Sequence, residues 1–123
     1  MRVLRTSAFI FTLGLAMNAI AQSPTVATTI AVVEAEYANI LLDADPDELR
    51  ELGLTAGTKF TFTHGGRSYT ATLVEEYGDV EQGEWLGRMW EQRVELAISF
   101  GNACTELSCK VGDTVTITAI GAK

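Results

Sequence analysis

The sequence predicts a single, mainly β domain: a small antiparallel β-barrel or sandwich of about six or seven strands with two short helices. Three observations support this fold class. Short alternating apolar segments recur at spacings of about 8–12 residues, glycine-containing turns separate them, and one structural unit occurs twice in the chain. A chain of 123 residues also has room for only one modest core. We therefore expect one β domain over residues 22–123, preceded by a signal peptide over residues 1–21.

The first predicted strand covers residues 25–36, because this run is rich in β-branched side chains and nearly free of helix-capping residues. Residues 37–39 should interrupt the strand, and residues 40–42 should resume an extended segment. Asp45 then precedes Pro46 and stands three residues before Glu48. This is the pattern of a capping box with proline at the first helical position, so it predicts a short helix that ends near Leu52.

The middle of the chain predicts a β-hairpin. Residues 58–63 alternate two phenylalanines with polar side chains, which is typical of a half-buried strand. Gly65-Gly66 is a strong two-residue hairpin signal, and the return strand should cover residues 67–75. The side chains expected on one face of that return strand are Tyr69, Ala71 and Leu73.

The last third predicts a second hairpin, a helical turn and a final strand. Turns are expected at Gly78-Asp79 and at Gln82-Gly83. Trp85, Met89 and Trp90 are expected to form an apolar cluster around a hairpin at residues 88–93. Three elements should follow: a strand buried on one face through Val94, Leu96 and Ile98 and mixed on the other, a helical turn capped by Asn102, and a last strand after the turn Val111-Gly112-Asp113.

The repeated unit has the order helix end, apolar residue, glycine turn and alternating strand. Residues 52–62 and residues 107–117 share this order, so we expect a pseudo-symmetric β structure. The repeat places Cys104 and Cys109 at positions that correspond to Leu49 and Leu54, so both cysteines should point inward and lie close together. In an oxidising compartment such a pair favours a disulfide, and two buried free thiols are the alternative.

The first residues resemble a secretory signal peptide. Arg2 and Arg5 precede an apolar run over residues 8–17, and Ala21 is the expected cleavage point. A retained membrane anchor is the alternative, although a membrane-spanning helix needs about 20 apolar residues. We expect a periplasmic or secreted protein with no membrane association after cleavage. Cleavage would leave seven basic and 16 acidic residues, which changes the net charge from −7 to −9. A protein this acidic is not expected to bind nucleic acid.

The sequence offers few signs of catalytic or metal chemistry. His64 is the only histidine, and a hairpin tip seldom provides the oriented partner that a general base needs. Motifs for Ser-His-Asp, zinc-protease or phosphate-binding sites are not found, so we expect no catalytic residue, cofactor or metal site. The acidic residues of the 75–84 segment lack the spacing of a calcium loop and predict a solvated surface. They are Glu75, Glu76, Asp79, Glu81 and Glu84.

Several motifs together resemble the C-terminal domain of the S-adenosylmethionine (SAM) hydroxide adenosyltransferases, the family of the SAM hydrolases and fluorinase-type halogenases. The resemblance covers about residues 33–117. Tyr77-Gly78-Asp79-Val80 is similar to the family's aromatic-Gly-acid-Val motif. The segment at residues 94–103 is similar to its Leu-Glu-Ile-Ala-Val-Asn-x-Gly-Asn-Ala strand, and residues 35–39 replace its opening Asp-Arg-Phe-Gly-Asn motif.

The resemblance implies that this domain holds adenine, while a separate N-terminal domain supplies the reaction centre. The residues implied on the adenine side are Tyr37, Asn39, Tyr77, Asn102 and Ala103. The tyrosines can stack on a ring and Asn39 can bond a base edge, although core-edge packing and a backbone-bonded turn residue are the alternatives for them. Few residues lie between the predicted cleavage point and the first matching strand, so we expect the catalytic domain to be absent from this chain.

The methionine side of the implied site differs from the family pattern. Ala35 replaces the opening aspartate, and Trp90-Glu91 replaces the Ser-Ser or Ser-Arg turn that grips the amino acid. A tryptophan there would fill the vacated pocket or, with Trp85, form an interaction surface for a protein partner or a second copy. We therefore expect an exported, non-catalytic module that binds a partner or an adenine-type small molecule. The alternative is a subunit that completes a SAM hydrolase site with a separate catalytic chain.

Overall fold

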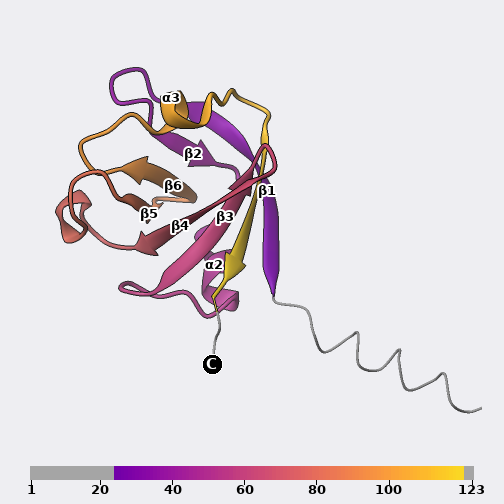
Figure 1. Ribbon diagram of the computed structural model, residues 1–123. Coiled ribbons are helices and arrows are strands. Elements are labelled where there is room, and N and C mark those ends of the chain that lie inside the picture. Colours follow the sequence, from indigo (N-terminus) through magenta and orange to yellow (C-terminus); the bar gives the residue numbers. More distant parts are fainter. Residues whose placement is uncertain (1–23, 121–123) are drawn as a thin grey trace, which may run out of the picture.

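The computed structural model describes residues 24–120 and contains a closed barrel of strands in the order β1-β2-β6-β5-β4-β3-β7 (Figure 1). This confirms the predicted β class and resolves the choice between barrel and sandwich. The strands are β1 (Thr25–Val33), β2 (Ile40–Leu42), β3 (Lys59–His64), β4 (Arg67–Leu73), β5 (Trp85–Trp90), β6 (Arg93–Ile98) and β7 (Thr114–Ala119).

Two short α-helices, α2 (Pro46–Glu51) and α3 (Ala103–Leu107), lie at opposite ends of the barrel (Figure 1). The predicted capping box of α2 is confirmed. The backbone N–H of Asp47 donates to the Asp45 carboxylate over 2.8 Å, and the Asp45 N–H donates to Glu48 Oε1 over 3.1 Å. The capping role predicted for Asn102 is wrong, because this residue stands at the N-cap of α3 but its side chain makes no capping hydrogen bond.

The repeated unit forms a pseudo-two-fold arrangement centred on β3 and β7. Phe62 and Ile117 occupy equivalent positions in the two units and pair with each other across the antiparallel strands. The helix ends are also equivalent. The Leu54 N–H donates to the Leu49 carbonyl over 3.2 Å, and the Cys109 N–H donates to the Cys104 carbonyl over 3.0 Å.

The predicted cysteine pair is a disulfide. Cys104 and Cys109 are joined by an S–S bond of 1.98 Å, and their Cα atoms are 5.1 Å apart. In the first unit the corresponding residues are the buried Leu49 and Leu54. The disulfide therefore closes one barrel end at the place where two leucines close the other.

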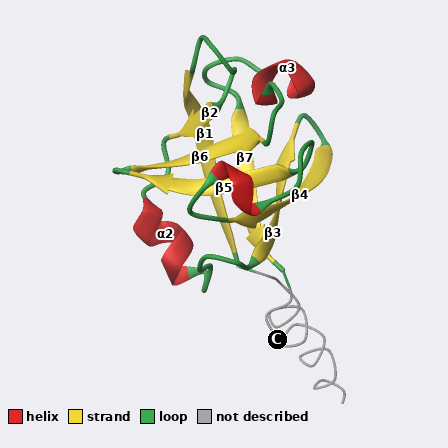
Figure 2. Ribbon diagram, turned by 90° about the vertical axis from the view of Figure 1, so that its left-hand side faces the viewer, coloured by secondary structure: helices red, strands yellow, loops and turns green. Residues whose placement is uncertain are grey.

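One pair of neighbouring strands departs from the predicted antiparallel barrel. β4 and β5 are parallel, with Thr72 beside Leu86 and Leu73 beside Gly87. A parallel connection requires the chain to cross over, and residues 74–84 do so along the outside of the barrel. This segment contains the 3₁₀-helix η2 (Tyr77–Asp79), which lies over the outer face of β5 and β6 (Figure 2).

The crossing segment buries the outer face of β6, which the sequence predicted to be mixed. Val94 and Leu96 point into the main core, whereas Ala97 joins a second, smaller core with Val74 and Leu86. Glu95 and Ser99 are also buried, at 2% and 1% exposure. The prediction of a mixed face is wrong because alternation alone does not reveal a segment that covers the barrel from outside.

Between residues 24 and 120, no helix has the length and apolar character needed to cross a membrane.

Candidate functional site

A buried carboxylate on the outside of the barrel organises the candidate site. Glu95 lies in the middle of β6, between Leu41 of β2 and Arg88 of β5, which are its neighbours in the sheet. Its side chain is only 3% exposed. A carboxylate removed from water needs hydrogen-bond donors and a positive partner, and the neighbouring side chains supply both.

Three side chains donate hydrogen bonds to Glu95. Oε2 accepts from the Tyr77 hydroxyl over 2.7 Å and from Asn39 Nδ2 over 3.0 Å. Oε1 accepts from Arg88 Nη1 over 3.3 Å. Asn39 Nδ2 also lies 3.3 Å from the Tyr77 hydroxyl oxygen. These contacts connect the β1–β2 loop, the crossing segment and two strands in one network.

The Tyr77 phenol is held in its protonated form. Burial raises its pKa above the ordinary value of 10.0, and the hydrogen bond to Glu95 and the charge of Glu95 raise the pKa further, while Arg88 lowers it in part. A protonated phenol donates to the carboxylate at neutral pH. Tyr77 therefore fixes the orientation of Glu95.

Arg88 lies over two aromatic rings. Its guanidinium carbon is 4.6 Å from the centre of the Tyr77 ring and 5.1 Å from the centre of the Trp90 ring. Both distances fall within the range of cation–π attraction. The Tyr77 ring that the sequence offered for stacking on a ligand is thus in contact with a side chain of the same chain.

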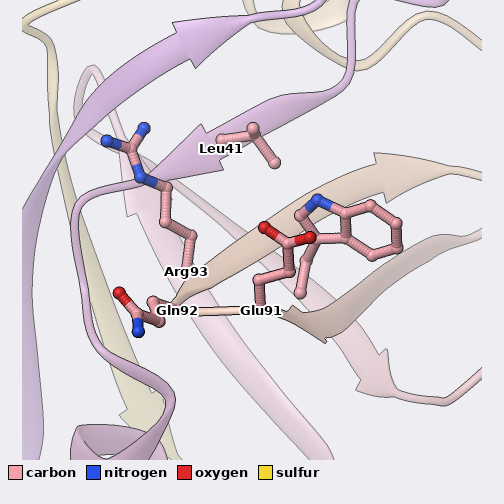
Figure 3. A pocket seen from close by; sticks show the side chains of 5 residues that line it. Leu41, Glu91, Gln92 and Arg93 are labelled. Atoms are coloured by element: carbon pink, nitrogen blue, oxygen red, sulfur yellow. The ribbon is translucent and has the colours of Figure 1, made fainter.

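Two hollows adjoin this network and share Leu41 and Trp90 as walls. The first, of about 380 Å³, is lined by Glu34, Leu41, Glu76, Tyr77, Arg88, Trp90 and Glu95. The second, of about 770 Å³, is lined by Leu41, Trp90, Glu91, Gln92 and Arg93. Figure 3 shows Leu41 of β2 across the hollow from Glu91 and Gln92, which form the β5–β6 turn. The outer face of β2, β6 and β5 therefore carries a continuous recessed surface.

His64 and Asp113 form a separate polar pair away from this face. His64 Nε2 lies 2.8 Å from Asp113 Oδ2, and the side chain of His64 is 10% exposed. The pair joins the β3–β4 hairpin to the turn before β7. Within residues 24–120, no three His, Cys, Asp or Glu side chains gather in a way that could hold a metal ion.

The comparison with family models gives one match, to the SAM hydroxide adenosyltransferase C-terminal domain, over residues 28–116. This match covers most of the chain. The chain belongs to the SAM hydroxide adenosyltransferase C-terminal domain family. Among curated proteins, none matches it.

Solved structures support the same fold for this member of the SAM hydroxide adenosyltransferase C-terminal domain family. An uncharacterized conserved protein from Thermotoga maritima is 24% identical, with a TM-score of 0.74 over 80% of this chain and 37% of its own length. A conserved hypothetical protein from Thermus thermophilus is 19% identical, with a TM-score of 0.51 over 77% of this chain and 35% of its own length. The chain thus spans little more than a third of either protein.

The residues implied by the family on the adenine side are only partly brought together. Asn39 and Tyr77 meet at Glu95, as described above. Tyr37, in the same loop as Asn39, is 59% exposed. Asn102 is exposed, and Ala103 is fully buried at the start of α3. The loop and α3 are adjacent, because the Cys104 N–H donates to the Ala38 carbonyl over 2.9 Å.

The two tryptophans do not lie together, contrary to the predicted apolar cluster. Trp85 packs against Phe62 and Tyr69, with ring centres 5.0 and 5.7 Å away, and Met89 also contacts the main core. Trp90 is an odd number of residues from both, so strand alternation directs it to the outer face, where it is 44% exposed. A surface shared by Trp85 and Trp90 is therefore not formed, and only Trp90 belongs to the recessed face.

Sequence reasoning missed the two charged residues at the centre of the site. Arg88 and Glu95 pair across β5 and β6. The available signal was an acidic residue inside the apolar run Val94-Glu95-Leu96-Ala97, within a motif shared with the family. An acid in such a position is almost never fully buried unless it is paired.

Proposed function

We propose that this protein is a binding module that does not cleave SAM by itself and that takes its ligand on the outer face of β2, β6 and β5. The observation that carries this proposal is the meeting of Asn39 and Tyr77 at the buried Glu95, beside a hollow of about 380 Å³. A recessed surface that combines aromatic side chains with a few fixed polar groups is the usual form of a small-molecule site.

The absence of SAM cleavage is proposed from the turn between β5 and β6. In the family this turn binds the amino-acid part of SAM. Here Trp90, the last residue of β5, and Glu91, which follows it, stand at the positions of the family's binding residues. The α-carboxylate of the amino acid needs hydrogen-bond donors, whereas Glu91 places a second carboxylate in the hollow. Ala35 also lacks the carboxylate of the family's opening aspartate. These replacements disfavour SAM more than they disfavour adenosine or adenine.

Calorimetric titration of the disulfide-intact protein with SAM, adenosine and adenine tests this proposal, together with a chromatographic assay for adenosine release from SAM. We expect no adenosine release and weaker binding of SAM than of adenosine. A micromolar affinity for SAM that exceeds the affinity for adenosine would contradict the proposal. That result would favour a subunit that completes a SAM hydrolase site with a separate catalytic chain.

We also propose that the protein is exported to the periplasm or secreted. The predicted signal peptide, residues 1–21, lies outside the described residues. The Cys104–Cys109 disulfide supports export, because disulfides persist mainly in oxidising compartments. Mass spectrometry of the exported protein should find Gln22 at the N-terminus, and retention of residues 1–21 would contradict the proposal.

A further inference from the structure

The outer face carries a slot whose walls are the Tyr77 and Trp90 rings and whose floor includes Glu95 Oε1. A guanidinium group occupies this slot, and it belongs to Arg88. Two aromatic faces and a carboxylate within reach of one group are what recognises a planar cation. Their arrangement suits such a cation whether it comes from this chain or from a ligand.

Arg88 is held in the slot by few polar contacts. Its one hydrogen bond to Glu95 is 3.3 Å long, whereas charge-assisted N–H···O bonds are usually about 2.7–2.9 Å. The pairing is not bidentate, although a guanidinium can bond a carboxylate through two N–H groups. Since Oε2 already accepts two hydrogen bonds, Oε1 is the atom that retains capacity for a second donor.

The walls of the slot come from parts of the chain with partial exposure. Tyr77 lies in the 3₁₀-helix of the crossing segment and is 38% exposed, and Trp90 is the last residue of β5. Departure of Arg88 would leave the lining of the hollow with three carboxylates, those of Glu34, Glu76 and Glu95. The charge left behind favours a cation over a neutral ring.

We propose that the slot between Tyr77 and Trp90 is a recognition site for a guanidinium-bearing ligand, and that Arg88 fills it in the free protein as a built-in stand-in. This inference rests on the proposed binding function and specifies the ligand class for the same face. The ligand displaces Arg88, stacks between the two rings and donates to Glu95 Oε1. The same chemistry can come from a small guanidine or from an arginine on a protein partner.

The test removes the side chain of Arg88 and supplies a free guanidinium group in its place. The Arg88→Ala variant should bind methylguanidinium with a dissociation constant of roughly 1–10 mM, as suits a ligand with few atoms, and the wild type should bind it at least about tenfold more weakly. Binding is followed by NMR through the indole N–H signal of Trp90. Arg67→Ala is the matched control, because Arg67 is exposed at the β3–β4 hairpin and lines neither hollow. It should behave as the wild type does.

Two further controls test whether binding depends on the positive charge of the ligand and on the negative charge of Glu95. Methylurea, a neutral molecule of the same shape, should produce no saturable shift in Arg88→Ala. Adding Glu95→Gln to Arg88→Ala should weaken methylguanidinium binding by about tenfold or more, because the carboxylate is the cation's partner. If Arg88→Ala does not fold, Arg88→Gln is used, because glutamine keeps most of the aliphatic stem and carries no guanidinium group.

Agmatine and an acetylated Gly-Arg-Gly amide, titrated into the wild type, distinguish the two sources of the guanidinium group. Saturable binding of either to the wild type supports the assignment, because the ligand must displace Arg88. If neither binds the wild type, methylguanidinium only refills the space left by the removed side chain in Arg88→Ala, and the assignment is overturned. Equal responses of Arg88→Ala to methylguanidinium and methylurea would overturn it, as would binding of adenosine without methylguanidinium. The two proposals can fail separately. If the wild type binds adenosine and Arg88→Ala does not bind methylguanidinium, the guanidinium site is refuted and the proposed binding function is not.

Discussion

Asn39 and Glu95 are separated by 56 positions in the chain, yet Asn39 Nδ2 donates to Glu95 Oε2 over 3.0 Å in a buried hydrogen bond. This contact ties the loop between β1 and β2 to the middle of β6. The amide that the family resemblance offered to an adenine edge therefore already has a partner within the chain. A ligand on this face must bond to the shared network or rearrange it.

Glu95→Ala should lower the free energy of unfolding by about 3 kcal/mol, because it leaves Arg88 without its partner and removes the acceptor for Asn39 and Tyr77. Asn39→Ala should cost about 1.5–3 kcal/mol, since it removes a donor to the buried Glu95 carboxylate. Urea unfolding measures both changes. The exposed Glu81→Ala is the control and should change stability by less than about 0.5 kcal/mol. A Glu95→Ala loss no larger than that of the control would contradict the role assigned to the network.

Gly87→Ala should destabilise the barrel by about 1–3 kcal/mol through overpacking. A methyl group built on Gly87 would lie 2.7 Å from Cζ of Phe60, whose side chain is fully buried. Gly78→Ala is a matched control, because a methyl group there meets no atom within 4 Å. Thermal unfolding of the two variants should show a lower midpoint for Gly87→Ala alone. Equal midpoints would show that Phe60 can move without cost.

The His64–Asp113 pair should make stability depend on acidic pH. The hydrogen bond from His64 is the largest cause that holds the pKa of Asp113 below its ordinary value of 3.8, and the Lys110 N–H contributes in the same direction. The unfolded chain therefore binds a proton at Asp113 more readily than the folded chain does. The stabilisation is fully present above about pH 5, starts to fall near the ordinary pKa of 3.8 and is lost as the pH drops through the lowered pKa.

Asp113→Asn removes this titration. The wild type should be more stable than Asp113→Asn at pH 7, and the difference should shrink as the pH falls below 3.8. Urea unfolding at several pH values between 7 and 2.5 measures the difference. A constant difference over this range would refute the titration as its source. Asp43→Asn, at an exposed position in the loop before α2, is the control for a general charge effect.

Reduction of the Cys104–Cys109 disulfide should lower the free energy of unfolding by about 2 kcal/mol, at the low end for disulfides because the bridged residues are only 5 apart. Unfolding with and without a reductant measures this change. A Cys104→Ala, Cys109→Ala double variant should not respond to the reductant. Alkylation of both thiols in the unreduced, denatured protein would contradict the disulfide itself.

Local features of the chain could be predicted from the sequence because their causes are local. The capping box at Asp45, the Gly65-Gly66 turn and the alternation of Phe60 and Phe62 depend on neighbours a few residues away. The repeated unit also predicted where Cys104 and Cys109 would meet, since its first copy places Leu49 and Leu54 together. The family followed from motifs that lie within short stretches.

The site itself was decided by tertiary structure. The sequence indicated Asn39 and Tyr77, but it did not show that they meet at Glu95 or that Arg88 lies over the rings of Tyr77 and Trp90. These contacts depend on the parallel pairing of β4 and β5, which sends residues 74–84 across the outside of β6. Alternation fixes which side chains share a face of a strand, and it carries no information about what covers that face. Burial of Glu95, and with it the candidate site, is a property of the assembled barrel.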